Sequence, residues 1–176
     1  MNTKNLVALA LLIGIGAVLH AVVPPIFLGM KPDMMLTMMF LGILLFPEIK
    51  NVFLVSIVTG IISGVTTTFP GGLFPNIIDK FVTGLLIFVL ISALGKYRNN
   101  IVSVGVITAI GTLISGTVFL TSAYYIVGLP GPFIGLFAAV VLPATAINTV
   151  TMVIIYPIVT TIFKRTKLST PESIKL

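Results

Sequence analysis

Residues 143–163 read PATAINTVTMVIIYPIVTTIF, an apolar run that ends abruptly at the basic sequence KRTK. A helix of about 21 residues rises roughly 31 Å, which matches the hydrocarbon core of a lipid bilayer. Pro143 suits the first turn of a helix, where its missing N–H has no partner to lose. Lys164, Arg165 and Lys167 suit the opposite end, among lipid headgroups. The run therefore predicts a membrane-spanning helix.

The polar residue Asn148 lies inside this run, beside Thr145 and Thr149. A carboxamide that faced lipid would leave its donors and acceptors unpaired, at a cost of a few kcal/mol. We therefore expect Asn148 to face protein, water or a ligand. Two interpretations stay open: a hydrogen bond between helices, or the lining of a small-molecule pocket near one face of the membrane.

The composition agrees with a membrane protein. Apolar residues make up 57% of the chain and charged residues only 8%, whereas soluble domains carry about 25% charged residues. The absence of Cys excludes disulfides and thiolate metal sites. The net charge of +6 is interpreted through membrane topology rather than nucleic-acid binding.

Further apolar runs, separated by Pro, Gly and charged residues, repeat this pattern along the chain. We expect an all-α integral membrane bundle of six transmembrane helices in one domain, residues 1–176. The expected spans are about 6–23, 34–46, 52–68, 77–94, 101–127 and 143–163, followed by a cytoplasmic tail at 164–176. The short apolar segment 133–141 is ambiguous, because it fits either a re-entrant element or part of a span.

The positions of Lys and Arg predict the orientation, since these residues favour the cytoplasmic side. If the N-terminus is cytoplasmic, the outer segments hold only Lys31 and Lys80, and the other eight of the ten basic residues lie inside. Both termini are then cytoplasmic. Three loops rich in Pro and Gly, at 24–33, 69–76 and 128–132, fall on the outer side, where they are suited to cover an outward-facing site.

Several classes of chemistry find no support in the sequence. Neither a GxxxxGK[ST] loop nor an HExxH motif occurs, which argues against ATP hydrolysis and a zinc helix in this chain. His20, the single histidine, is interpreted as an interfacial or packing residue, with a ligand contact as the alternative. No acidic residue lies in the middle of an expected span, which disfavours ion coupling. We expect no catalytic residue, metal or cofactor, and hence no enzyme.

Two aspartates on the outer side, Asp33 and Asp79, are candidates for ligand binding. Each also fits a capping role: Asp33 precedes the second span, and Asn76 with Asp79 resembles a capping box. Alternatively, an aspartate binds the ammonium of a zwitterion whose carboxylate contacts Lys31, Asn76, Asn148 or backbone N–H groups. One residue can serve both roles.

Aromatic and small residues form two further patterns. Aromatic side chains gather towards the outer side, where they either belong to the membrane interface or stack on a flat ligand. Ser56, Gly60 and Gly64 form a row at helical spacing that predicts internal helix packing. Ala10 and Gly14 form a second row, for which internal packing and docking of a partner membrane subunit both stay open.

Three stretches in this order resemble the small bacterial tryptophan transport protein family, and more distantly the S components of energy-coupling factor (ECF) transporters. They are PPIFLGMKPDMMLTMMFLGILLFPEIKN (24–51), TTTFPGGLFPNIIDKFVTGLL (66–86) and LPATAINTVTMVIIYPIV (142–159). The resemblance implies a multi-pass protein of the bacterial cell membrane that captures tryptophan from outside.

The resemblance also implies positions for the site and for partners. By position, the substrate-binding candidates are Lys31, Asp33, Phe69, Phe74, Asn76, Tyr124, Tyr125, Asn148 and Thr149. Ala10 and Gly14 stand where S components dock an ECF transmembrane subunit driven by ATPases, with Ala-xxx-Gly in place of Ala-xxx-Ala. Two alternatives stay open: an S component for another small ligand such as a vitamin, or a membrane scaffold in which Asn148 is purely structural.

Overall fold

The computed structural model describes residues 3–22 and 33–165. Helices are the only regular secondary structure in these residues. Because α6, η2 and α7 form one continuous helix from 133 to 165, the expected all-α bundle of six helices is confirmed. The elements are α1 (Thr3–Val22), α2 (Met34–Leu45), α3 (Ile49–Val65), α4 (Leu73–Leu94), the 3-10 helix η1 (Gly95–Asn99), α5 (Ile101–Ile126), α6 (Phe133–Leu136), the π-helical turn η2 (Phe137–Val141) and α7 (Leu142–Arg165).

The helices differ in their capacity to cross a bilayer. Four of those described are long and apolar enough: α1, α4 continued by η1, α5, and the 133–165 helix. With 12 residues, α2 is much shorter. At about 1.5 Å per residue it measures roughly 18 Å, well under the hydrocarbon thickness of about 30 Å.

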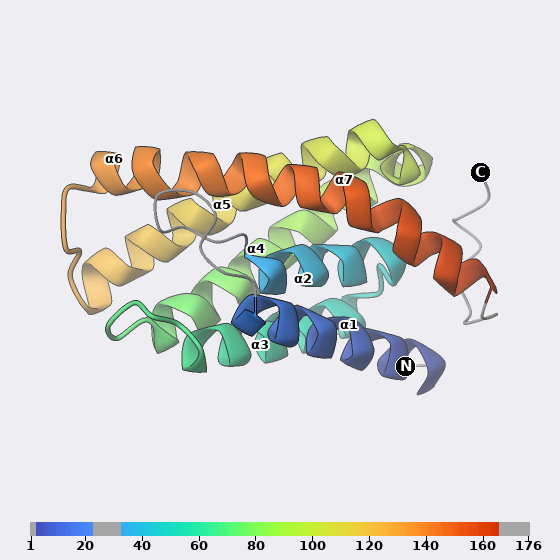
Figure 1. Ribbon diagram of the computed structural model, residues 1–176, viewed down its shortest axis with the longest axis horizontal. Helices are drawn as coiled ribbons and strands as arrows, with labels where there is room; N and C mark the ends of the chain where they lie inside the picture. The colour runs from blue at the N-terminus through green and yellow to red at the C-terminus, as the bar shows by residue number, and fades with distance from the viewer. Residues whose placement is uncertain (1–2, 23–32, 166–176) are drawn as a thin grey trace.

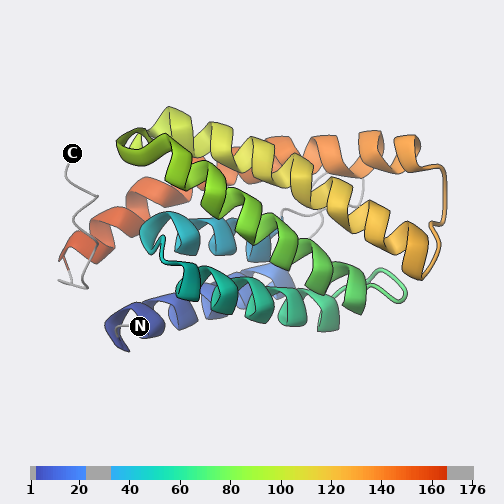
Figure 2. The same cartoon turned by 180° about the vertical axis from the view of Figure 1, so that it is seen from behind.

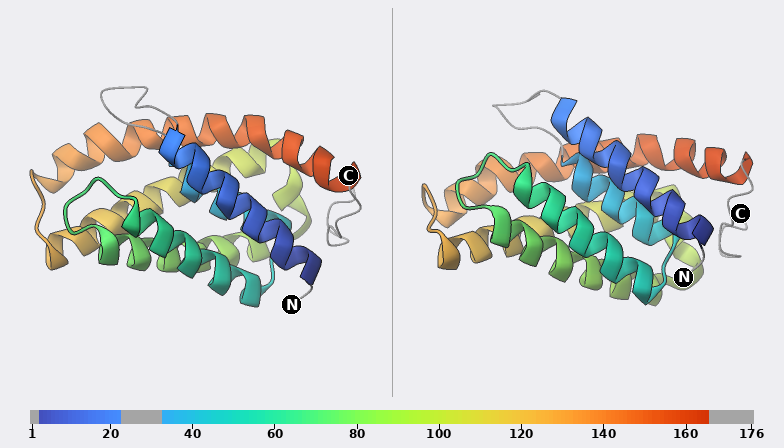
Figure 3. Two further views of the ribbon diagram at one scale, coloured as in Figure 1. Left: turned by 60° about the horizontal axis from the view of Figure 1, so that its bottom comes forward. Right: turned by 90° about the horizontal axis from the view of Figure 1, so that it is seen from below.

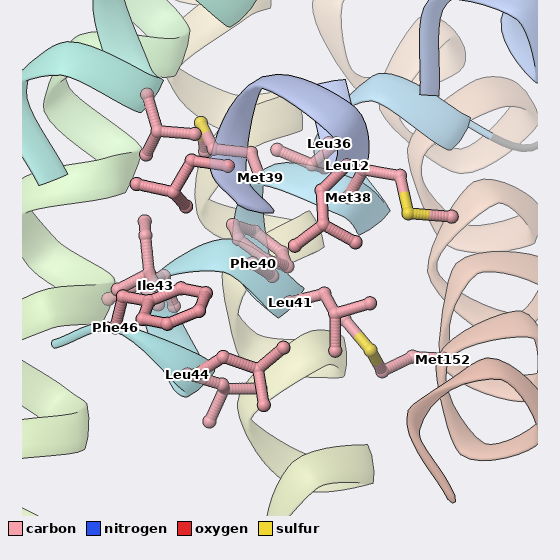
Figure 4. Packing of buried hydrophobic residues seen from close by; sticks show 14 of the residues in the cluster. Leu12, Leu36, Met38, Met39, Phe40, Leu41, Ile43, Leu44, Phe46 and Met152 are labelled. Carbon is pink, nitrogen blue, oxygen red and sulfur yellow. The ribbon is translucent and has the colours of Figure 1, made fainter. Parts of the chain in front are cut away.

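The short helix α2 forms the centre of the bundle. All twelve of its residues are buried, and α1, α3, α4, α5 and α7 all contact it. Figure 4 shows side chains of α2 among Leu12 of α1 and Met152 of α7. A helix that is apolar all round belongs in a protein interior. Because other helices cover α2, it does not need to reach both faces of the membrane.

The two ends of the bundle carry different connections. One end of the bundle holds the start of α1, the end of α7, the turn between α2 and α3, and η1, whereas the α3–α4 and α5–α6 connections lie at the other (Figures 1 and 2). We call the second end the loop end. The start of α2 lies part-way along the bundle, short of the loop end, and α1 crosses the outside of the bundle beside it (Figure 3).

Small residues allow α3 and α4 to approach closely. A Cβ added at Gly60 would lie 2.9 Å from Ile77 Cα, and one added at Gly64 would lie 3.0 Å from Leu73 Cα. The predicted internal packing of this row is therefore confirmed. Gly14, by contrast, has no heavy atom of another described residue within 4 Å of such a Cβ. Gly14 and Ala10 are both exposed on the outside of α1.

Four helices begin earlier than the sequence pattern indicates. The first begins at Thr3 rather than at 6, and the third begins at Ile49 rather than at 52. The fourth begins at Leu73 rather than at 77, and the last begins at Phe133 rather than at Pro143. Segment 133–141 is thus part of the last helix. A proline within a helix clashes with the carbonyl four residues earlier. For Pro143 this carbonyl lies inside the π-helical turn 137–141, whose altered hydrogen bonding lets the helix continue.

Replacing Gly60 by Ala should separate α3 from α4 and lower the free energy of unfolding by about 1–3 kcal/mol, as other overpacked interiors do. Thermal unfolding in detergent measures this loss. Gly14→Ala is the matched control, because its new methyl group meets open space and Ala favours a helix over Gly by about 1 kcal/mol. Equal stability of both variants and the unmodified protein would contradict the close packing of α3 on α4.

Candidate functional site

A cavity of about 340 Å³ lies towards the loop end of the bundle. Its lining comes from α3, α4, α5, the 133–165 helix, the end of α1 and the α3–α4 connection. The start of α2 borders it through Leu36 and the N-cap residue Asp33. Small-molecule sites typically have volumes of about 300–1,000 Å³. Because α2 begins part-way along the bundle (Figure 1), the space beyond its start is where this cavity can form.

A buried charge cluster lies at the polar side of the cavity. Lys80 Nζ lies 2.7 Å from Asp79 Oδ2 and 3.0 Å from Asp33 Oδ2, and it donates to Ser115 Oγ at 3.4 Å. Lys80 and Asp79 are 2% and 1% exposed. An ammonium has three protons, so each proton of Lys80 has an acceptor.

Asp79 is equally well satisfied. Its Oδ1 accepts from Thr83 Oγ1 at 3.0 Å, and its Oδ2 accepts from Ser115 Oγ at 2.9 Å as well as from Lys80. Buried ions are tolerated only where such partners replace water. Two carboxylates around one ammonium give the cluster of Asp33, Asp79 and Lys80 a formal charge of −1.

Asp33 joins this cluster to α2 and α7. Its Oδ1 accepts from the backbone N–H of Leu36 at 2.9 Å, which caps the start of α2 as expected. The backbone N–H of Asp33 in turn donates to Asn148 Oδ1 on α7, also at 2.9 Å. All three members of the cluster line the cavity, but the Asp33 side chain, at 28% exposed, is the most accessible of them.

Asn148 combines the two roles left open by the sequence. It links α7 to the start of α2 through Asp33, and it lines the cavity. It is 1% exposed, and its Nδ2 has no hydrogen-bond partner among residues 3–22 and 33–165. Asn148 thus carries a buried amide donor at the wall of the cavity.

An aromatic pair lines the cavity further towards the loop end. The rings of Phe69 and Phe119 meet edge to face, with centroids 5.4 Å apart. Phe119 follows Ser115 by four residues, so the pair lies about one helical turn, roughly 5.4 Å, from the charge cluster. The cavity is therefore charged on one side and aromatic on the other.

The structure brings together only part of the predicted substrate-binding set. Asp33, Phe69, Asn76 and Asn148 line the cavity, whereas Phe74, Tyr124, Tyr125 and Thr149 do not. The first three of these four are 62%, 59% and 80% exposed. Lys31 lies outside the described residues. His20, expected to be interfacial or structural, also lines the cavity.

Lys80 was not predicted as a member of the site, and Asp79 was considered as a ligand-binding aspartate but was not included in the predicted substrate-binding set. With an expected helix start at 77, Lys80 counted as a charge at the outer end of the span, and Asn76 with Asp79 resembled a capping box. In the structure Gly72 is the N-cap, Asn76 Nδ2 donates to Gly72 O, and Asp79 lies about two turns inside α4. Asp79 does not lie in the middle of the span, but it is a buried acid well inside a membrane helix, which the sequence pattern did not indicate. The sequence feature that could have indicated this buried pair is the presence of two adjacent charges, Asp79 and Lys80, in an otherwise apolar segment.

Comparisons with known proteins agree on one family. The family model described as "Tryptophan transporter TrpP" matches residues 2–164. A Bacillus subtilis protein named "Probable tryptophan transport protein" is 59% identical over 94% of this chain and 95% of its own. Proteins with the same name from Clostridium acetobutylicum and Clostridium perfringens are 45% and 40% identical, covering 89% and 95% of this chain and 91% and 97% of their own. No solved structure gives a significant match.

Replacing Lys80 by Met should lower the free energy of unfolding by about 3–5 kcal/mol, because it leaves a buried carboxylate without its counter-charge. Chemical unfolding in detergent measures the loss. Adding Asp79→Asn should recover part of it, since only the partly exposed Asp33 then stays charged. A Lys80→Met protein as stable as the original would show that the cluster does not hold α2 and α4 together.

Proposed function

Since the chain belongs to the tryptophan transporter TrpP family, we propose that this multi-pass membrane protein captures tryptophan in the cavity and takes it up into the cell. One observation supports this choice: the cavity has charged groups on one side and an aromatic pair about one turn away. Tryptophan carries a charged head group and an indole ring separated by one methylene. The two sides of the ligand and of the cavity therefore correspond.

The orientation we propose places the loop end outside. Of the seven described Lys and Arg residues, six belong to segments at the end that holds the start of α1 and the end of α7, and Lys80 is buried in the bundle. Cytoplasmic segments are enriched in Lys and Arg. The cavity then faces the exterior, where substrate is captured.

The centre of the bundle supports a two-step mechanism. From the cavity, α2 extends towards the end opposite the loop end, and all of its residues are buried. No bound molecule passes along a helix packed in this way. Release to the cytoplasm therefore requires α2 and its neighbours to rearrange after binding, as gating elements of transporters do.

The energy for this rearrangement has two possible sources. If the protein works as an ECF S component, a transmembrane subunit and ATPases supply the energy. The exposed pair Ala10 and Gly14 on α1 is then the docking surface. Small residues let the backbones of two membrane helices approach closely. Alternatively, the chain transports tryptophan without a partner subunit.

Tryptophan binding is testable by fluorescence, because the chain contains no Trp of its own. Titration of the purified protein should give a saturable change in tryptophan emission. Phe69→Ala and Phe119→Ala should each weaken binding by about two- to tenfold, the equivalent of an aromatic contact of about 0.5–1.5 kcal/mol. Tyr97→Ala is the control, since this residue is exposed at the opposite end. Absence of saturable binding would refute the proposed function.

Bulky residues at Ala10 and Gly14 distinguish the two energy sources. If a partner subunit docks there, Ala10→Leu with Gly14→Leu should abolish uptake of labelled tryptophan by cells while binding in detergent stays unchanged. Val18→Leu serves as a control, because it keeps a large apolar residue at an exposed position of the same helix. Normal uptake by the double variant would rule out docking through this surface.

A further inference from the structure

The charge cluster leaves one carboxylate available to a ligand. Lys80 has an acceptor for each of its protons, and both oxygens of the buried Asp79 accept hydrogen bonds. Asp79 Oδ1 has room for a second bond, but Asp79 and Lys80 are only 1% and 2% exposed, so neither offers an accessible group to the cavity. Each oxygen of Asp33 accepts one bond, from Leu36 N or from Lys80 Nζ. A carboxylate oxygen can accept about two hydrogen bonds. Asp33 can therefore accept further hydrogen bonds, and its side chain is 28% exposed.

A free donor lies directly beside this free acceptor. Asn148 Oδ1 is held by the backbone N–H of Asp33 at 2.9 Å. That bond fixes the orientation of the amide. Its Nδ2 then has no hydrogen-bond partner among the described residues and is available to donate to a ligand. The N-terminus of α2 lies at the same place, and its partial positive charge also favours an anion.

We propose that Asp33 and Asn148 together recognise the head group of an α-amino acid: the ammonium binds the Asp33 carboxylate and the carboxylate binds Asn148 Nδ2. This inference rests on the proposed function and adds the chemistry of recognition to it. In an α-amino acid both charged groups are attached to one carbon, which matches an acceptor and a donor on residues that are directly hydrogen-bonded.

Lys80 and Asp79 have a different role in this arrangement. They do not touch the ligand; they hold the Asp33 side chain by the 3.0 Å contact to Lys80 Nζ. Because Lys80 is shared between two carboxylates, the cluster keeps a surplus negative charge that an incoming ammonium neutralises. The Phe69 and Phe119 rings then select the side chain of the amino acid.

The unmodified protein provides the first test, by competition of analogues against labelled tryptophan. Tryptamine lacks the carboxylate and indole-3-propionate lacks the ammonium. Each should bind at least about tenfold more weakly than tryptophan, because each loses a charge-assisted hydrogen bond. If both analogues compete as well as tryptophan, the head group is not recognised and the inference fails, although tryptophan binding itself would stand.

Two variants provide a reciprocal test. Asp33→Asn keeps a capping side chain but removes the charge, so it should lose tryptophan affinity by about tenfold or more and lose its preference for tryptophan over indole-3-propionate. Asn148→Asp keeps an oxygen for the Asp33 N–H but replaces the donor by an anion. It should reject tryptophan and shift the preference towards tryptamine.

Glu48→Gln is the matched control, because it removes an exposed acid at the opposite end of the bundle and should leave all three affinities unchanged. Thermal unfolding of each variant shows whether it is folded. An unchanged order of preference in both folded variants would overturn the assignment of Asp33 and Asn148. If the unmodified protein binds none of the three compounds, the proposed function has failed instead.

Discussion

The fold depends on neutralising one lysine in a membrane interior. The ammonium of Lys80 is 2% exposed, in a bundle whose outside is apolar, and it is stable there only because Asp79 and Asp33 supply counter-charges. Asp33 is not on the same helix but is the cap of α2, and its backbone is held by Asn148 of α7. A single electrostatic requirement therefore sets where α2 begins relative to α4, α5 and α7.

The position of that start determines the shape of the interior. A helix of 12 residues that is covered on all sides fills only part of the length of the bundle. The remainder, towards the loop end, is the cavity. The charges that hold α2 in place thus also form the polar wall of the space that α2 leaves empty. The structural role and the proposed binding role coincide on Asp33 and Asn148, which is why neither could be assigned to one role from sequence.

The sequence predicted the architecture well, because apolar run length and the punctuation by Pro, Gly and charge are local signals. It also singled out Asp33 and Asn148, since a polar side chain within or beside an apolar run must find a partner. The burial of Lys80 and Asp79 was missed for a simple reason. A helix start misplaced by four residues, at 77 instead of Leu73, placed two adjacent charges in the first turn of the span instead of about two turns inside the helix. The sequence also placed Tyr124 and Tyr125 near the predicted outer end of a helix. It did not reveal that both side chains point away from the cavity, because this depends on how α5 is rotated against its neighbours.

Four of the twelve residues of α2 are methionines, at positions 34, 35, 38 and 39, and all are fully enclosed. Unbranched thioether side chains adapt their shape to new surroundings with little loss of packing. A central helix built in this way can slide or tilt against its neighbours without opening voids, as a stiff core of β-branched residues could not. The barrier beneath the cavity is thus made of the most deformable apolar material that the amino acids provide.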